Sequence, residues 1–124
     1  MLNLDTNIII EGLIGELTNR ELELLENETI AISDIVLWEI SKLIQHKRIE
    51  LDTDSPAFRK LLAQLTVFPI TLEIARQSTA LDFSSDPADE LIAATSIVER
   101  IPLLTRDRKI LKSKIVPLAG EEYV

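Results

Sequence analysis

The hydrophobic residues of the chain fall into two alternating kinds of segment. Five short apolar runs are bounded by polar or turn-forming residues and predict buried strands over 2–4, 29–33, 67–70, 102–105 and 115–118. Between them, apolar residues recur at spacings of three and four, which predicts helices over 8–14, 18–27, 34–46, 55–65, 71–81 and 87–100. A short helical turn is expected after residue 108. Pro69 makes the run 67–70 an edge strand or ends it early.

Short strands that alternate with helices are typical of a parallel sheet covered on both faces. We therefore predict an α/β fold, a three-layer α/β/α sandwich on a mainly parallel sheet of four to five short strands. The 124 residues contain no internal repeat and no linker, so a single domain over 1–124 is expected. In such sheets ligands bind outside the carboxyl ends of the strands.

Acidic residues gather at that predicted edge. Asp5 follows the first strand, and Asp107 comes two residues after the fourth. Glu39 lies about one and a half turns into the helix that follows the second strand. Asp86 and Asp89 begin the helix that precedes the fourth strand. Four stretches far apart in the sequence are therefore expected to bring carboxylates to one place.

Each acid also has a purely structural interpretation. Asp5 and Asp107 could cap the helices that follow them, and Asp86 with Asp89 could form a capping box around Pro87. Glu39 is harder to explain in this way, because its helical neighbours Ile35, Val36 and Leu43 are apolar. A carboxylate on an apolar stripe is rarely left without a partner, since burying a lone charge is costly.

Composition limits what such an acidic site could bind. The sequence has no cysteine and one histidine, which excludes thiolate nucleophiles, cysteine zinc sites and multi-histidine metal sites. Carboxylates that converge repel one another, and a divalent cation would relieve that repulsion. Ligation by oxygen alone favours Mg²⁺ or Mn²⁺. Such an ion activates water and neutralises a phosphate under attack, which is the chemistry of phosphodiester hydrolysis.

Four motifs in register carry a more specific resemblance. They are L-D-T-N at 4–7, L-W-E-I at 37–40, D-P-A-D-E-L-I-A-A-T at 86–95 and P-L-L-T-R-D at 102–107. With these motifs the chain resembles the PIN-domain ribonucleases, and most of all the VapC-type toxins of type II toxin–antitoxin pairs. The resemblance covers residues 2–118, nearly the whole chain.

The resemblance implies a Mg²⁺- or Mn²⁺-dependent endoribonuclease. Its four catalytic acids would be Asp5, Glu39, Asp89 and Asp107, with Asp86 as a further metal ligand or only a helix cap. Polar residues that would hold water or orient the acids are Thr6, Asn7 and Thr105. It also implies an RNA substrate, a cognate antitoxin that inserts a basic residue into the acidic pocket, and a toxin homodimer.

The distribution of charge matters more than its sum. The formal net charge is −8, and residues 1–40 alone hold nine acids and one base. Part of this excess is candidate metal-site acid, and the remainder around 11–28 would suit a basic partner. Residues 100–114 hold six bases and one acid, so Arg106, Arg108 and Lys109 are candidate RNA contacts, although the run could equally be a solvated face.

Other interpretations stay open at this stage. One is a receiver-like regulatory domain that binds Mg²⁺ and a phosphoryl group. A haloacid-dehalogenase-like phosphatase would need a second aspartate two residues after Asp5, and a PIN fold without activity would serve as a binding module.

Trp38 is expected in the core or at a partner interface, and His46 at the surface. No apolar run approaches the roughly 20 residues of a membrane span, and no signal-peptide pattern opens the chain, so a cytoplasmic protein is expected.

Overall fold

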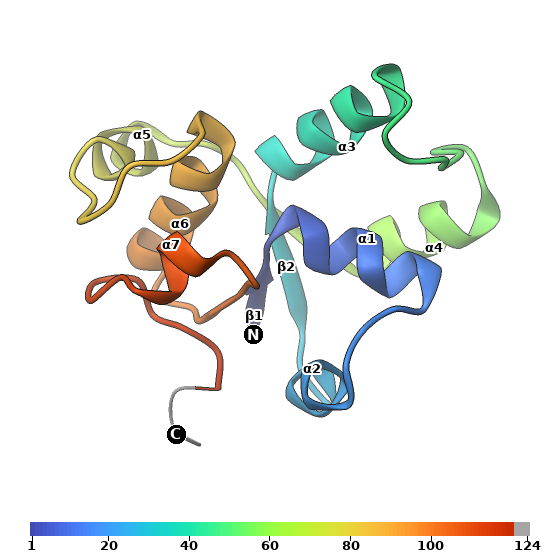
Figure 1. Cartoon of the computed structure of the whole chain (residues 1–124), viewed down its shortest axis with the longest axis horizontal. Coiled ribbons are helices and arrows are strands. Elements are labelled where there is room, and N and C mark those ends of the chain that lie inside the picture. Colours follow the sequence, from blue (N-terminus) through green and yellow to red (C-terminus); the bar gives the residue numbers. More distant parts are fainter. Residues whose placement is uncertain (121–124) are drawn as a thin grey trace.

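The computed structural model describes residues 1–120 and is built around a parallel sheet (Figure 1). Its strands are β1 (Leu2–Leu4), β2 (Ile30–Ser33), β3 (Thr66–Phe68) and β4 (Leu103–Leu104). They lie in the order β3-β2-β1-β4, and every pair is parallel. The predicted parallel sheet is confirmed, and the strand that Pro69 follows is at the edge, where the missing N–H of proline does least harm.

The strand predicted over 115–118 is wrong in extent. Only Leu118 pairs, through an isolated parallel bridge to β4. The segment before it forms a turn that Ser113 stabilises, because its Oγ accepts a hydrogen bond from the backbone N–H of Val116 at 3.1 Å. Pro117 has no N–H to donate to a neighbouring strand. Val116 and Leu118 of this run are buried, but the run is a loop and not a full strand.

Seven helices lie within residues 1–120, and their ends differ from the predicted bounds by three residues or fewer. They are α1 (Thr6–Ile14), α2 (Asn19–Leu25), α3 (Ile35–Gln45), α4 (Pro56–Gln64), α5 (Leu72–Ser78), α6 (Pro87–Glu99) and α7 (Arg108–Leu111). None of the helices in this part of the chain is long and apolar enough to cross a membrane.

Side-chain caps fix several helix starts. Thr18 and Glu21 form a reciprocal capping box at α2, with Glu21 Oε1 accepting from the Thr18 backbone N–H at 2.8 Å. Ser55, directly before Pro56, caps α4 through its Oγ, and this is where the sequence predicts the helix to begin. At α3 the Oγ of Ser33 accepts from the first backbone N–H, while the side chain of the residue at the cap position makes no capping bond.

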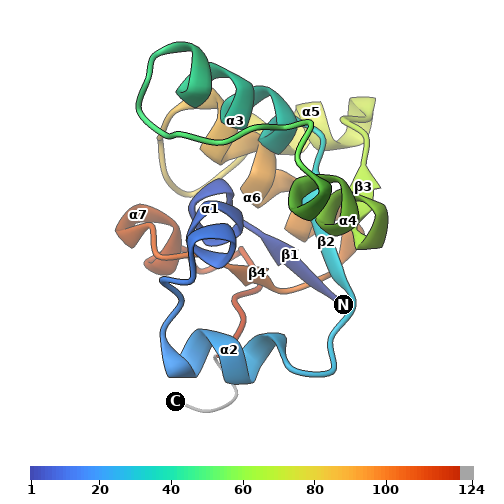
Figure 2. The ribbon, with the colours of Figure 1, turned by 90° about the vertical axis from the view of Figure 1, so that its right-hand side faces the viewer.

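The helices cover both faces of the sheet. In Figure 1, α5, α6 and α7 lie on one side of the strands, and α1 and α4 lie on the other. Helix α3 lies beyond the carboxyl end of β2, where it contacts α6 and α1. Helix α2 lies at the opposite end of the molecule in both views (Figure 2). The predicted three-layer α/β/α arrangement is confirmed.

A buried polar side chain joins β1 to α6. Asn3 is 0% exposed, and its Nδ2 donates to the backbone oxygen of Ile92 at 3.2 Å and to Ser96 Oγ at 2.9 Å. These bonds fix the height of α6 along the sheet. They therefore set where Asp5, at the end of β1, lies relative to Asp89, in the first turn of α6.

Candidate active site

Asp5 lies at the centre of the acidic edge and is 4% exposed. It caps α1, and its Oδ1 accepts from the backbone N–H of Thr6 at 2.9 Å. Its Oδ2 accepts from the hydroxyl of Thr105 at 2.6 Å. Burial raises the pKa of Asp5, these two hydrogen bonds lower it in part, and the charge of Asp107 raises it further. Asp5 is thus both a helix cap and a buried carboxylate whose charged form is disfavoured.

Glu39 comes to the same place from α3. The neighbouring α3 residues Val36 and Ile40 are buried in the core, whereas the carboxylate of Glu39 accepts the hydroxyl hydrogen of Thr6. Burial raises the pKa of Glu39, and the charges of Asp5 and Asp86 add to that rise against the hydrogen bond from Thr6. Of the apolar neighbours that made Glu39 unusual in the sequence, Val36 is buried and Ile35 packs against the core, whereas Leu43 is not part of the core.

Asp89 enters from the first turn of α6. The hydroxyl of Ser85 donates to its Oδ2 at 3.0 Å. Burial, and then the charges of Asp5, Glu39 and Asp107, raise the pKa of Asp89 to about 6. Four acids from separate parts of the chain are therefore close enough to repel one another.

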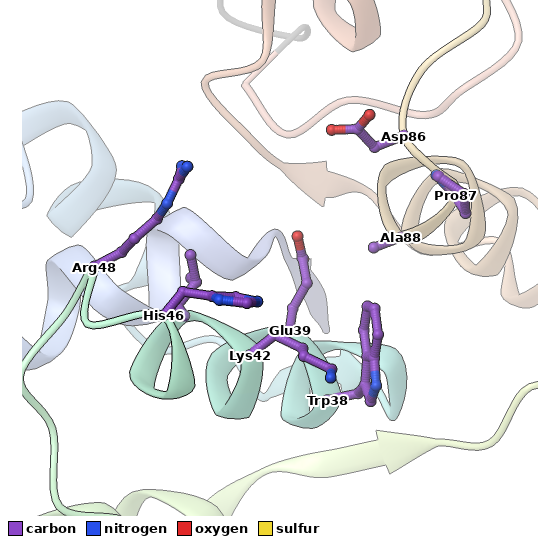
Figure 3. Close-up of a pocket in the computed structure, with 9 residues that line it drawn as sticks. Trp38, Glu39, Lys42, His46, Arg48, Asp86, Pro87 and Ala88 are labelled. Carbon is purple, nitrogen blue, oxygen red and sulfur yellow. The ribbon is translucent and has the colours of Figure 1, made fainter.

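The capping-box interpretation of Asp86 and Asp89 is wrong. Asp86 holds the cap position of α6, but its side chain makes no capping hydrogen bond. Asp89 bonds to Ser85, and the backbone N–H of Ser85 donates to Glu90 at 3.3 Å. Asp86 is exposed, and its carboxylate is directed into the space between α6 and α3 (Figure 3).

Asp107 does act as the helix cap that the sequence allowed. Its Oδ1 accepts from the backbone N–H groups of Lys109 at 2.8 Å and Ile110 at 3.2 Å, at the start of α7. Its own N–H donates to the hydroxyl oxygen of Thr105 at 3.0 Å. The cap and the site are compatible, because the charge of Asp107 still reaches Asp5 and Asp89.

Two of the three predicted supporting residues contact the acids. Thr6 donates to Glu39, and Thr105 donates to Asp5. Asn7 is exposed on α1, and its side chain forms no hydrogen bond within residues 1–120. Ser85, which the sequence places only in a loop, is a contact that the motifs missed. It stands directly before the D-P-A-D stretch, and nothing in the apolar pattern marks it.

The basic residues after β4 divide into two kinds. Arg106 is held by Glu21, with Nε at 2.7 Å and Nη2 at 2.6 Å from the two carboxylate oxygens. The pKa of Glu21 falls to about 2, mainly because of these hydrogen bonds. Arg108 and Lys109 are exposed and form no ion pair within residues 1–120. Glu21 is thus occupied inside the fold and is not part of an exposed acidic surface.

A family model for the PIN domain matches residues 3–114. This chain belongs to the PIN domain family. Ribonuclease VapC22 of Mycobacterium tuberculosis is a relative that is 33% identical over 86 residues, which span 67% of this chain and 66% of the relative. The resemblance stated from the four motifs is confirmed, and the receiver-like and dehalogenase-like alternatives are set aside.

Solved structures show the same fold. A toxin–antitoxin complex from Klebsiella pneumoniae has a TM-score of 0.72 and 23% identity, with 96% of this chain and 97% of that chain covered. VapBC2 from Rickettsia felis, bound to a DNA fragment from its promoter, has a TM-score of 0.70 and 24% identity over 95% and 97% of the two chains. The fold of this PIN domain is therefore shared with solved chains that have little sequence in common with it.

The donor atoms of this PIN domain suit a hard cation. Every candidate ligand is a carboxylate oxygen, and the nearby Thr6, Thr105 and Ser85 supply neutral hydroxyls without any positive charge. Within residues 1–120 no three acidic or histidine side chains are close enough to enclose one ion. Mg²⁺ commonly uses only one or two carboxylates and keeps several waters, so the wider spacing fits an ion that retains its hydration.

Beside the acids lies a cavity of about 660 Å³ between α3 and the start of α6 (Figure 3). Glu39 and Asp86 form its acidic part. Trp38 also lines it and is 54% exposed, so of the two positions expected for Trp38, core or partner interface, the structure excludes the core. His46 is exposed, as predicted, and lies near the far end of α3 in the same cavity.

Proposed function

We propose that this PIN domain is a divalent-metal-dependent endoribonuclease that acts as the toxin of a toxin–antitoxin pair. The observation that carries the proposal is the meeting of Asp5, Glu39, Asp89 and Asp107 from four separate stretches, with burial and mutual repulsion raising the pKa of the first three. A relative named as a ribonuclease and structural neighbours described as toxin–antitoxin complexes support it. A single domain over residues 1–124 is part of the same proposal.

The metal would be held by carboxylates at the carboxyl ends of the strands. Mg²⁺ or Mn²⁺ bound there would lower the pKa of a water molecule and neutralise a phosphate. The ligands would come from Asp5, Glu39, Asp89, Asp107 and the exposed Asp86. The hydroxyls of Thr105, Thr6 and Ser85 hold three of these acids in fixed orientations. Hydrogen bonds to carboxylates that bind a metal tune the affinity for the metal and the basicity of the ligands.

The proposed partners follow from the same site. An antitoxin would neutralise the toxin by placing a basic side chain among the unpaired carboxylates. RNA would meet Arg108 and Lys109 on one flank of the acids, since both are exposed. Arg106 is a weaker candidate, because RNA would have to displace Glu21 from it. A homodimer and a cytoplasmic location complete the proposal.

Substitution of Asp5 tests the activity directly. Asp5→Asn keeps the shape and one of the two acceptor oxygens of Asp5 but removes the charge, so cleavage of single-stranded RNA should fall at least about 100-fold. Cleavage by the unaltered chain should stop in EDTA and return with Mn²⁺. Glu73→Gln, an exposed acid on α5, is the matched control and should cleave normally. Cleavage by Asp5→Asn at the normal rate, or cleavage that persists in EDTA, would refute the proposal. An unaltered chain that cuts no RNA would favour the inactive binding module.

A further inference from the structure

One face of α3 carries a line of polar, ionisable side chains that begins at the acidic site. Glu39, Lys42 and His46 are three and four residues apart and therefore share a face of the helix. The helical rise places Lys42 about 4.5 Å and His46 about 10.5 Å along the axis from Glu39. All three line the cavity between α3 and α6, together with Arg48 just after the helix (Figure 3). The acidic site therefore continues into a basic groove.

The basic groups of this groove are available to a ligand. Lys42, His46 and Arg48 are exposed, and none forms an ion pair within residues 1–120. Among the described residues, Lys42 donates a hydrogen bond only to Gln45 on its own helix, at 3.1 Å. Arg106 shows the contrast, because Glu21 already occupies its guanidinium. Unpaired bases next to acids suit a polyanion whose reacting phosphate lies over the acids.

Trp38 adds a stacking surface to the same groove. It projects from the α3 wall opposite Pro87 and Ala88, which form the α6 wall (Figure 3). More than half of it is exposed, and the ammonium of Lys42 lies 5.8 Å from its ring centroid. An exposed indole beside unpaired cations is the combination that binds unpaired bases, since every base has a flat face to stack. A duplex keeps its bases stacked on one another, so it offers no such face.

We infer that this groove receives single-stranded RNA, with an unpaired base stacked on Trp38 and neighbouring phosphates held by Lys42 and Arg48. The inference rests on the proposed nuclease function and deepens it. It assigns substrate binding mainly to α3, whereas the sequence pointed to the basic run after β4. A protein partner seated on Trp38 is the competing occupant, and the test below separates the two.

The first experiment uses Trp38 as its own probe, because it is the only tryptophan of the chain. Asp5→Asn protein in Mg²⁺ is titrated with a short single-stranded RNA and with a duplex of the same sequence, and the fluorescence of Trp38 is followed. Single-stranded RNA should quench the emission at saturation, and the duplex should not. The measurement needs no cleavage, so it stands even if the nuclease proposal fails. Binding by anisotropy that leaves the emission of Trp38 unchanged would overturn the inference.

The second experiment separates binding from chemistry in the otherwise unaltered enzyme. Trp38→Ala should raise KM for single-stranded RNA at least about fivefold with little change in kcat, whereas Trp38→Phe should retain most of the affinity. Lys42→Ala with Arg48→Ala should reduce the slope of log affinity against log salt by about 1.4. Lys60→Ala, an exposed lysine on α4, is the matched control and should leave KM unchanged.

Two results would contradict the assignment of the groove to RNA. Unchanged KM and salt slope in both groove variants would show that RNA binds elsewhere. Loss of antitoxin binding by Trp38→Ala, with RNA binding intact, would assign the groove to a protein partner. Failure of Asp5→Asn to lose activity would instead refute the nuclease site, and neither groove result depends on that outcome.

Discussion

Thr105 donates its hydroxyl hydrogen to Oδ2 of Asp5 at 2.6 Å, although 100 positions separate the two residues in the chain. Pairing of β1 with β4 makes this possible, because Leu4 and Leu104 lie opposite each other and the next residues of both strands leave the sheet together. The same hydroxyl oxygen accepts from the backbone N–H of Asp107. One threonine thus orients two of the four acids.

Thr105→Val should therefore impair both the site and the fold. Valine removes the donor from a buried carboxylate, which costs about 1–3 kcal/mol of unfolding free energy. The pKa of Asp5 should rise further, because the hydrogen bond that lowers it is lost. Metal-dependent cleavage should fall about 10- to 100-fold. Denaturant unfolding and single-turnover kinetics measure the two effects. Thr105→Ser keeps the hydroxyl and should retain most of the stability and most of the cleavage activity. If the valine and serine variants behaved alike, the role given to the hydroxyl would be contradicted.

Asp89 predicts an unusual dependence of stability on pH for the metal-free protein. Its pKa rises from 3.8 to about 6 on folding, so its contribution to stability is full below about pH 4 and is lost as the pH rises through about 6. The unfolding free energy of the unaltered chain minus that of Asp89→Asn should therefore decrease over this range in EDTA. Added Mg²⁺ should offset the decrease by binding the ionised site. A difference that stays flat or increases from pH 4 to pH 7 would contradict the raised pKa.

The acids could be predicted from sequence because their positions depend on strand ends. In a parallel sheet every carboxyl end meets at one edge, so Asp5 and Asp107 were expected together once the strands were placed. Glu39 was marked by apolar neighbours on its own helix. The loop at 115–118 was missed because a buried apolar run looks the same whether or not its backbone pairs.

Contacts between distant side chains were beyond the reach of the sequence. Nothing in the pattern links Arg106 to Glu21, which lie 85 positions apart. The basic run after β4 looked like a free surface because charge counts do not show which groups are paired. A core position was one of the two expected for Trp38, because tryptophan is usually well buried, but its side chain is 54% exposed. Pairing and exposure are set by tertiary packing.

The Arg106–Glu21 pair should stabilise the fold, since it ties α2 to the loop after β4. Glu21→Gln should lower the unfolding free energy by about 1–2 kcal/mol at neutral pH, with the exposure of Arg106 limiting the value. The pKa of Glu21 falls from 4.5 to about 2 on folding, so this stabilisation is present above about pH 4.5 and is lost as the pH drops toward 2. Denaturant unfolding of both chains at neutral and acidic pH checks this.

An exposed ion pair provides the comparison. Asp54 and Arg59 lie 3.0 Å apart with side chains that are 83% and 70% exposed. Asp54→Asn should change the unfolding free energy by less than about 0.5 kcal/mol. A loss as large as that of Glu21→Gln would show that burial of Glu21 is not what makes its pair effective.

Asn3 and Ser96 should be energetically coupled, because the buried amide of Asn3 holds α6 against β1. A double-mutant cycle with Asn3→Ala and Ser96→Ala should give a coupling energy of about 0.5–1.5 kcal/mol. Asn3→Ala paired with Ser41→Ala should be additive, since the side chain of Ser41 donates to Leu37 of its own helix at the surface, away from Asn3. The same contact fixes the position of Asp5 relative to Asp89. Asn3→Ala should therefore also weaken the stabilisation of the protein by Mg²⁺ against heat, measured as the shift in Tm. Additivity in the first cycle, or a full Mg²⁺ shift in Asn3→Ala, would contradict the view that this buried amide aligns the two acids.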